Sequence, residues 1–496
     1  MTSTIAPAGG SVPLVARLQD RDPGLPVLAL VIGAITLARL IALVVSPSDL
    51  GFDEAQYWAW SKDFAFGYFT KPPLVAWVIA LETGICGDGA ACVRAASPLF
   101  HGATAFVLAM LARRLYGRAT GFWTGIFYVI LPGVSVSSFL MTTDVMLMFF
   151  WAVALLSFFV YLERPSIGWA LVFGIAAGLG LNAKYAMIYL PAMIAVAAIV
   201  LPEIRAKVLR WPALLALVVM LAFIAPNVWW NATNGFATYT HTGDNIGWSL
   251  SRLNYKDGFE FFGAQFGVAG PVVFGAMLNA LLLGARSERP DTDRLLLWLS
   301  WPVVIAITLQ GFLSNANANW GATAYPAGVI VATALVIRHR WRFFFRANLI
   351  FCGIVALGAL AATAALNPMA ASGPAKQFRQ LGGWSETGQG LEAVAREQNA
   401  TRLVIGGRTL TAGLLHALRN SPLSIRAFLP AGRAPADQFQ LDRPWSPGDT
   451  TDGTLLFGFD ERSARKLGAK PVATIDAPIY SAPDGKMIVY GVGNEQ

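Results

Sequence analysis

The chain has 496 residues, of which 55 % are hydrophobic and 13 % are charged, and its formal net charge is +8. Soluble domains carry roughly a quarter charged residues, so this composition excludes a single soluble fold and indicates an integral membrane protein. The basic residues lie mostly in short loops and form no dense patch with interleaved aromatic residues. Nucleic acid is therefore excluded as the partner that the positive charge would otherwise suggest.

Apolar runs long enough to cross a hydrocarbon core of about 30 Å recur along the chain. Before the first run, the N-terminal segment 1–25 contains Arg17 and Arg21, and no small-residue cleavage site follows that run directly. We therefore expect a cytoplasmic N-terminal segment and a retained first helix. The pattern predicts an α-helical polytopic protein with about eleven or more transmembrane helices, over residues 26–45, 94–115, 119–138, 145–162, 167–182, 184–201, 211–230, 262–284, 295–313, 321–337 and 345–366.

Lysine and arginine divide the loops between these helices into two groups. With the N-terminus inside, the cytoplasmic loops hold Arg113, Arg114, Arg118, Arg164, Arg205, Lys207, Arg210, Arg286, Arg289, Arg294, Arg338, Arg340, Arg342 and Arg346, and the opposite loops hold Lys62, Lys71, Lys184, Arg252 and Lys256. Short loops rich in Lys and Arg stay in the cytoplasm. The asymmetry predicts that the sparser loops and the C-terminal segment face the periplasm, across a bacterial inner membrane.

The first outer loop, residues 46–93, contains the first acidic stretch. Asp53 and Glu54 directly follow the first predicted helix, and Asp144 opens an apolar run farther along. An ionised carboxylate at this depth is costly unless it faces water, a partner or a substrate, so we expect a functional role. A helix cap is the structural alternative.

Two lysines are expected on the same outer face as these acids. Lys71 precedes Pro72 and Pro73, which fix the backbone, and Lys184 lies between two membrane spans. A rigid turn that holds one ammonium near the interface suits a phosphate, whereas a snorkelling interfacial lysine is the plainer interpretation. Two acids and two lysines together favour a shared polar site.

Aromatic and amide side chains accompany these charges in the outer loops. They can stack on a sugar or hydrogen-bond to it, although Trp and Tyr also belong to the interfacial belt. The candidates for substrate contact are Tyr57, Tyr68, Asn319, Trp320 and Tyr325. His241 could meet a phosphate or a metal, so a divalent cation stays open as a cofactor, but no paired histidine spacing supports a metal site.

The cysteines in this loop also fit an outer location. Cys86 and Cys92 are close in sequence, which in an oxidising periplasm permits a disulfide that closes a short loop. Two unpaired small residues in a Gly/Ala-rich turn are the alternative. Cys352 lies inside a predicted helix and is expected only to pack.

Residues 369–496 have a different character from the rest of the chain. Charged residues, Gly and Pro become common, and apolar runs shorten to strand length at 402–405 and 454–457. Helix-like stretches at 390–397 and 463–467 lie before and after them. The pattern predicts a small soluble α/β domain on the same face as the polar loops.

Motifs for soluble nucleotide donors are missing from the sequence. It contains no phosphate loop, no Rossmann fingerprint in strand and helix context, and no His-Glu-x-x-His. A reaction on the outer face, away from cytoplasmic nucleotides, would need a donor that is already activated and carried by the membrane.

Several short motifs together resemble the bacterial glycosyltransferase family 39 type. They are Asp53-Glu54-Ala-x-Tyr57-Trp58, Tyr68-Phe-x-Lys71-Pro-Pro-Leu-Val-Ala-Trp77, Thr143-Asp144 at a helix start, Gly178-Leu-Gly-x-x-x-Lys184-Tyr185, residues 226–231, and Asn319-Trp320 with Tyr325. That family has the GT-C fold and includes lipid A aminoarabinose transferases and relatives of protein O-mannosyltransferases. The resemblance covers residues 26–368, essentially the whole membrane part, and is loose after that.

The resemblance implies an inverting transfer from a polyprenyl-phosphate sugar to an acceptor at the periplasmic face. The expected acceptor is lipid A, lipopolysaccharide or another envelope glycoconjugate. By that analogy Asp53 is the candidate general base, Lys71 holds the donor phosphate, and Asp144 orients acceptor, sugar or cation. Glu54 is expected to belong to the same catalytic group and to support the first loop. Lys184 and His241 are expected as further contacts to the donor phosphate.

The sequence departs from the aminoarabinose branch at two positions. Gln56 stands where that branch tends to carry Arg, and Thr70 where it tends to carry an acid. These changes leave the donor sugar open among a hexose, a hexuronic acid and an amino sugar. The rival interpretations are a flippase for lipid-linked sugars, a protein O-glycosyltransferase and a structural membrane subunit. The expected partners are the lipid-linked donor, a lipid or glycolipid acceptor and membrane lipids, and not nucleic acid.

Overall fold

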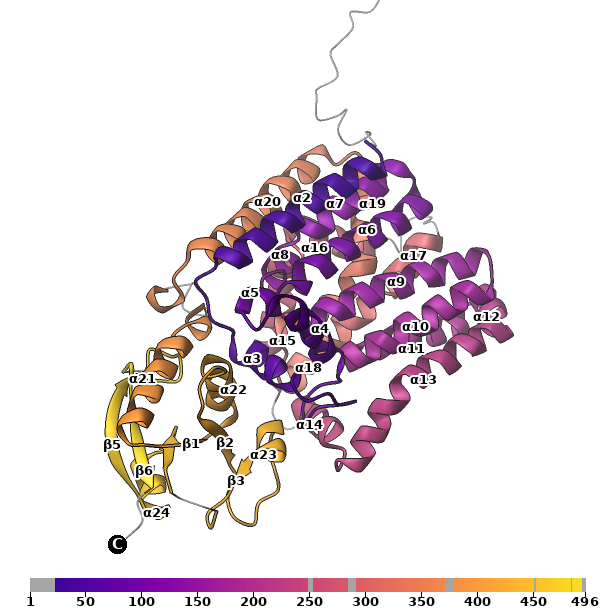
Figure 1. Cartoon of the computed structure of the whole chain (residues 1–496). Helices are drawn as coiled ribbons and strands as arrows, with labels where there is room; N and C mark the ends of the chain where they lie inside the picture. Colours follow the sequence, from indigo (N-terminus) through magenta and orange to yellow (C-terminus); the bar gives the residue numbers. More distant parts are fainter. Residues whose placement is uncertain are drawn as a thin grey trace, which may run out of the picture.

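The computed structural model describes residues 23–248, 253–283, 291–371, 378–449, 452–482 and 484–492 (Figure 1). Five basic residues used for the predicted orientation lie outside these ranges: Arg17, Arg21, Arg252, Arg286 and Arg289. Residues up to Ala370 form helices, namely α2 (Leu25–Val45), α3 (Phe52–Trp60), α4 (Leu74–Cys86), α5 (Ala90–Val93), α6 (Ala96–Tyr116), α7 (Arg118–Ile130), α8 (Pro132–Ser137), α9 (Thr143–Glu163), α10 (Ile167–Ala183), η1 (Tyr185–Ile188), α11 (Tyr189–Val200), α12 (Pro202–Val208), α13 (Trp211–Thr233), α14 (Ala237–Ile246), α15 (Tyr255–Val268), α16 (Pro271–Leu283), α17 (Asp291–Trp298), α18 (Trp301–Leu313), η3 (Ala318–Ala324), α19 (Tyr325–Arg338), α20 (Arg342–Ala365) and η4 (Pro368–Ala370).

The long apolar helices confirm a polytopic membrane protein. Among the described residues, seven helical stretches are long and apolar enough to cross a membrane, or eight if one bent pair counts as a single span. The helices α10 and α11 are shorter, and α3 and α4 belong to the first outer loop. The expected number of crossings, about eleven, stays a prediction.

The predicted spans 262–284, 119–138 and 295–313 are each interrupted between two helices. The prediction of one helix over 262–284 is wrong, because α15 and α16 meet at an angle of 118°. Gly270 between them has a φ of 78°, which an L side chain rarely adopts, and Pro271 then begins α16. The predicted helix over 119–138 is interrupted at Leu131, where Pro132 starts α8. At the second break the proline restricts the residue before it, Leu131, and so ends α7.

A buried arginine stabilises the second break. Arg39 on α2 is only 3 % exposed, and its guanidinium donates to the carbonyl oxygen of Val129 at 2.7 Å and to Ser138 Oγ at 2.9 Å. Backbone carbonyls at the end of α7 would otherwise lack partners in an apolar environment. Arg39 therefore caps the broken helix.

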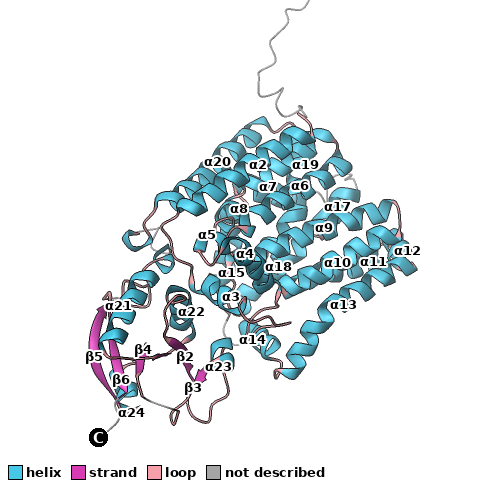
Figure 2. Cartoon of the chain, viewed as in Figure 1, coloured by secondary structure: helices cyan, strands magenta, loops and turns pink. Residues whose placement is uncertain are grey.

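The C-terminal part is the α/β domain that the sequence predicts (Figure 2). Its strands are β1 (Arg402–Ile405), β2 (Ser424–Phe428), β3 (Pro444–Trp445), β4 (Thr454–Phe457), β5 (Ala469–Asp476) and β6 (Lys486–Val492), and its helices are α21 (Trp384–Glu397), α22 (Arg408–Ala417), α23 (Gln438–Asp442) and α24 (Glu461–Lys466). The sheet order is β3-β2-β1-β4-β6-β5. The first four strands are parallel, whereas β6 is antiparallel to both β4 and β5.

The sheet domain lies against one end of the helical bundle, where α22 packs on α3 (Figure 1). Several hydrogen bonds join the two parts near this contact. Trp384 N–H donates to Asp49 Oδ2 at 2.9 Å, and Phe69 N–H donates to Gln438 Oε1 at 2.7 Å. His416 Nε2 donates to the carbonyl oxygen of Asp88 at 2.8 Å. The segment 46–93 is thus held between the bundle and the C-terminal domain.

Candidate active site

The two neighbouring acids of α3 have different surroundings. Glu54 is 4 % exposed and pairs with Arg94, whose Nε and Nη2 donate to its two carboxylate oxygens at 2.8 and 2.6 Å. The same oxygens accept from the backbone N–H groups of Gly51 at 2.9 Å and Met141 at 2.8 Å. Because both oxygens are fully engaged, the geometry gives Glu54 a structural role in the first loop and does not support a catalytic one.

Asp53 instead lies partly exposed at the contact with the C-terminal domain. Its side chain is 53 % exposed, and its Oδ1 lies 3.7 Å from Arg408 Nη2, in a helix of the C-terminal domain. Burial raises the pKa of Asp53 above its usual value, and the charges of Arg408 and Lys71 act in the opposite direction. A reachable carboxylate with a raised pKa is suited to accept a proton.

Lys71 sits at the end of a tight turn before α4. The backbone N–H groups of Tyr68 and Lys71 each donate to the other residue's carbonyl oxygen, at 3.1 and 3.3 Å, and Pro72 and Pro73 follow. The Lys71 ammonium has no hydrogen bond or ion pair with the residues that the structure describes. Burial lowers its pKa, as does nearby Lys184, whereas Asp53 and Asp144 raise it. Lys71 is therefore a cation between two acids, with donors left for a ligand.

Asp144, Lys184 and Asn319 form a connected polar group. Asp144 opens α9, and its Oδ1 accepts from Lys184 Nζ at 2.7 Å. Its Oδ2 accepts from Asn319 Nδ2 at 2.8 Å, from the short helix η3. Lys184 follows the last residue of α10, so three separate segments converge on one carboxylate.

A cavity of about 320 Å³ brings these residues together. Its polar lining is formed by Thr70, Lys71, Asp144, Lys184, His241 and Gln310, and Trp320 and Tyr189 contribute aromatic surface. Asp53 is not among the lining residues, but its charge acts on Lys71. Thr70 Oγ1 is buried without a protein partner in the described residues. The cavity thus offers donors and an aromatic wall, which suits a phosphorylated sugar.

The predicted aromatic residues do not all reach this cavity. Tyr68 is 1 % exposed, stacks on Trp60 and donates to the carbonyl oxygens of Trp60 and Asp63, at 3.0 and 2.9 Å. Tyr325 is 3 % exposed and donates to Gln265 at 2.5 Å. Both are packing residues, so substrate contact is not supported for either. Tyr57 is also buried, but the charges of Asp53 and Asp144 both act on its phenol.

His241 lines the cavity from α14. Burial lowers its pKa, and the positive charges of Lys71 and Arg408 lower it further, which favours the neutral imidazole. A neutral ring can exchange a hydrogen bond with a phosphate but adds no charge. In the described part of the chain, no group of three or more His, Cys, Asp and Glu side chains is arranged to hold a metal ion.

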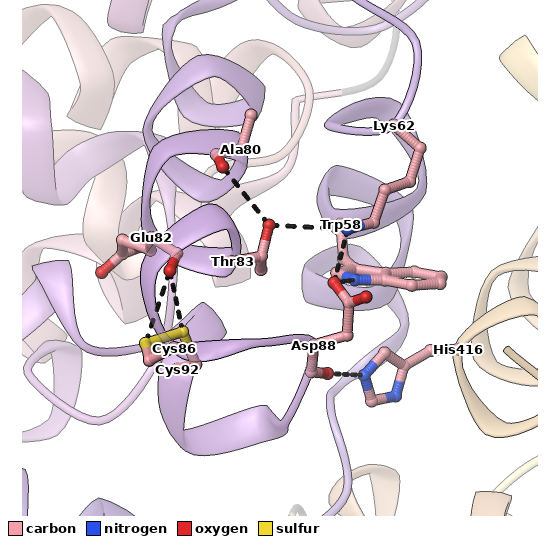
Figure 3. Close-up of a disulfide and its surroundings, with 9 residues drawn as sticks. All are labelled: Trp58, Lys62, Ala80, Glu82, Thr83, Cys86, Asp88, Cys92 and His416. Atoms are coloured by element: carbon pink, nitrogen blue, oxygen red, sulfur yellow. Dashed lines mark hydrogen bonds and ion pairs between the residues drawn. A yellow bond between two sulfur atoms is a disulfide. The ribbon is translucent and has the colours of Figure 1, made fainter. Parts of the chain in front are cut away.

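Cys86 and Cys92 form a disulfide at the edge of the first loop (Figure 3). The loop that it closes contains Asp88, whose Oδ1 accepts from Trp58 Nε1 at 2.8 Å and pairs with Lys62. The backbone carbonyl of Asp88 accepts from His416 of the C-terminal domain, and burial lowers the pKa of His416 to about 4. The closed loop therefore joins α3 to α22, the two helices that supply Asp53 and Arg408.

Comparison with known proteins gives three matches to glycosyltransferases. Residues 70–230 match the family of dolichyl-phosphate-mannose-protein mannosyltransferases. The chain is 39 % identical over 432 residues, 86 % of its length, to the lipid A galacturonosyltransferase RgtD of Rhizobium johnstonii, 89 % of which is covered. It is 30 % identical over 215 residues, 42 % of each chain, to the lipopolysaccharide core galacturonosyltransferase RgtA of the same organism. The chain belongs to the GT-C glycosyltransferases.

Solved structures give the same fold for this glycosyltransferase. ArnT from Cupriavidus metallidurans superposes with a TM-score of 0.64 in the apo state and 0.66 bound to undecaprenyl phosphate, at 16 % identity. In both comparisons 95 % of this chain and 99 % of ArnT are covered. The fold that the sequence motifs imply for the membrane part is thus confirmed, and the likeness extends over the C-terminal domain, where the motif resemblance is loose.

Sequence reasoning missed two arginines of the glycosyltransferase site. Arg94 pairs with Glu54 from the start of the α6 region, and Arg408 approaches Asp53 from the C-terminal domain. Arg408 directly follows Gly406 and Gly407, after a strand that the sequence does predict. The glycine pair is the one local feature of the sequence that marks a turn before Arg408. It does not indicate which part of the membrane domain Arg408 contacts.

Proposed function

We propose that this glycosyltransferase moves galacturonic acid from a polyprenyl-phosphate carrier to lipid A at the periplasmic face of the inner membrane. The lipid A galacturonosyltransferase relative supports the sugar and the acceptor, because it is similar over 86 % of this chain. The ArnT complex with undecaprenyl phosphate supports a polyprenyl donor through a shared fold. The single observation that carries the proposal is the Lys71 ammonium, which lines the cavity without a hydrogen bond or ion pair to any described residue and is subject to the charges of Asp53 and Asp144.

In the proposed reaction, the acceptor hydroxyl attacks the anomeric carbon on the face opposite the phosphate. The new bond joins that carbon to the acceptor oxygen, and the bond to the phosphate oxygen breaks. Asp53 takes the hydroxyl proton, which its raised pKa favours. Lys71 offsets the charge that develops on the departing lipid phosphate, an effect that is stronger in a partly dry cavity.

Asp144 and Lys184 would have a supporting part in this reaction. Their ion pair at 2.7 Å fixes the end of α10 against the start of α9. Asn319 holds the second oxygen of Asp144 and places Trp320 in the cavity wall. We assign Trp320 to the sugar or lipid surface, and Lys184 and His241 to contacts near the donor phosphate.

The distribution of charge along the helices supports a periplasmic site. The helix α9 begins at the cavity with Asp144 and ends at Glu163, which pairs with Arg114. Likewise, α19 follows the cavity segment η3 and ends at Arg338. The basic loop residues thus lie at the opposite ends of the helices that carry the site, which favours a cytoplasmic location for them.

The test is transfer in vitro by the purified full-length protein in detergent or lipid. The donor is undecaprenyl-phosphate-galacturonate, the acceptor is lipid A, and a periplasmic protein mixture serves as the competing acceptor. We expect lipid A that gains one hexuronic acid, measured by mass spectrometry, and no glycosylated protein. Transfer to protein alone, or no transfer while the donor binds, would reject the proposal.

A further inference from the structure

Arg408 reaches the site from a different domain. It is the first residue of α22, and the preceding Gly406 and Gly407 follow directly after strand β1. Gly407 has a φ of 98°, and this turn directs α22 across the face of α3. Arg408 Nη2 consequently lies 3.7 Å from Asp53 Oδ1, although 355 residues separate them in sequence.

The position of Arg408 is not explained by the stability of its own helix. The first turn of α22 contains no acidic residue, and the cap residue is a glycine without a side chain. The N-terminus of a helix carries partial positive charge, so a cation there is unfavourable. A residue that breaks such a local rule is often found at a functional site.

Docking of the C-terminal domain does not depend on Arg408 either. Asp49 accepts from Trp384 N–H at 2.9 Å and from Ser385 Oγ at 2.5 Å, and His416 donates to the carbonyl oxygen of Asp88. Arg443 makes a second long ion pair across the same interface, 3.5 Å from Asp63. The contact between Arg408 and Asp53 is one of several, and it is the one that borders the reactive carboxylate.

The hydrogen-bonding capacity of Arg408 is largely unused. The described residues supply it with one ion pair at 3.7 Å and no hydrogen bond, and its side chain is 32 % exposed. Its other acidic neighbour, Asp437, already accepts from the N–H groups of Phe439 at 2.8 Å and Gln440 at 3.0 Å as the cap of α23. The planar guanidinium therefore keeps donors for a ligand in the space beside Asp53.

The charges of the site match a donor with two anionic groups. Lys184 is already neutralised by Asp144 at 2.7 Å, so Lys71 and Arg408 are, among the described residues near Asp53, the cations with free capacity. The donor in the proposed function carries a phosphate and, on the sugar, a carboxylate. A compact ammonium suits the phosphate, and the guanidinium fork matches a carboxylate in a bidentate arrangement.

We propose that Arg408 binds the sugar carboxylate of the donor, so that the C-terminal domain selects a hexuronic acid over a neutral hexose. This inference rests on the proposed function, because it concerns the same donor. Arg408 lines a second pocket, together with Phe52 and Trp384, and its charge acts on Lys71 of the first cavity. Arg408 is then a specificity-determining residue. In this proposal the membrane domain supplies the side chains that catalyse the transfer, and the C-terminal domain supplies the side chain that distinguishes one sugar from another.

The experiment compares two donors on the same undecaprenyl phosphate, one with galacturonate and one with galactose, with lipid A as acceptor. We expect the wild-type protein to prefer galacturonate in kcat/KM. In Arg408→Gln this preference should fall about 30-fold, mainly through KM for the galacturonate donor, because a charge-assisted hydrogen bond is lost. Arg408→Lys should keep part of the preference, because it retains the charge without the fork.

Arg443→Gln is the matched control, because it removes a similar interface pair whose exposure, 31 %, is nearly that of Arg408. It should keep the wild-type donor preference, and thermal stability of all variants checks that the domain stays docked. The inference would be overturned if both Arg408 variants kept the wild-type donor preference, or if their activity fell equally with both donors. In that case, galacturonate transfer by the wild-type protein would still support the proposed function. Absence of galacturonate transfer by the wild-type protein would reject the proposed function itself.

Discussion

The two ends of the helical bundle use charge in different ways. At the end with the basic loops, Asp293 is 1 % exposed and accepts from Tyr116 at 2.6 Å and from Arg338 at 2.8 and 3.1 Å. At the other end, Asp53 has one partner at 3.7 Å, and Lys71 has none among the described residues. Charges with short, complete pairing stabilise structure, whereas incompletely paired charges in a cavity are available to a ligand.

The same contrast exists within one helix at the site end. Glu54 resembles Asp293, because four donors saturate it, and Asp53 next to it does not. Substitution of these two acids should therefore affect different properties. The variants below separate loss of turnover from loss of stability.

The largest effect is expected for Asp53→Asn. The amide keeps the shape of the side chain but cannot take the proton from the hydroxyl of the acceptor substrate. Turnover should therefore fall about 1,000-fold, within the range for a general base. Binding of undecaprenyl phosphate and the melting temperature should stay near those of the wild type. Asp63→Asn is the control, because Asp63 lies in the same loop and forms a similarly long pair, with Arg443. Turnover of Asp53→Asn within a few-fold of the wild type would contradict the assignment.

Glu54→Gln should reduce stability more than chemistry. Loss of the charge leaves Arg94 buried without its partner, which costs about 3–5 kcal/mol. Thermal unfolding of the purified protein measures this effect. Asp293→Asn should destabilise to a similar degree from the opposite end of the bundle. A fully stable Glu54→Gln protein with no turnover would instead return Glu54 to the catalytic group.

The sequence predicts much of this site because membrane topology constrains it. Asp144 and Lys184 stand at helix ends on one face, so a correct set of spans brings them together. Glu54 could not be separated from Asp53 in this way, because neighbouring residues on a helix point roughly 100° apart and the partner Arg94 is 40 residues away.

The C-terminal domain shows the same division. Short apolar runs predict β1 and β4 at their observed residues, since local pattern determines strands. The approach of Arg408 to Asp53 depends on how two domains dock, which no periodicity encodes. The break between α15 and α16 had a local signal in Gly270 and Pro271, but a continuous apolar run concealed it.

Lys71→Ala should weaken donor binding with a smaller effect than loss of Asp53. The ammonium has no protein partner to release among the described residues, so its removal should cost mainly the contact with the phosphate, about 10- to 100-fold in affinity. Titration with undecaprenyl phosphate measures the dissociation constant. Lys62→Ala is the matched control from the same loop, because Lys62 is committed to Asp88. Equal affinity in the two variants would exclude the phosphate role.

The smallest effect is a shift in pH dependence. Burial raises the pKa of Asp53, so kcat/KM should fall with decreasing pH at a value above 3.8, where the carboxylate takes up a proton. Arg408 lowers that pKa, and its removal in Arg408→Gln should therefore move this acidic limb to higher pH. Galactose-carrying donor is used for the profile, because it lacks the sugar carboxylate that would also respond to the substitution. An acidic limb that moves to lower pH would show that Asp53 is not the group that titrates.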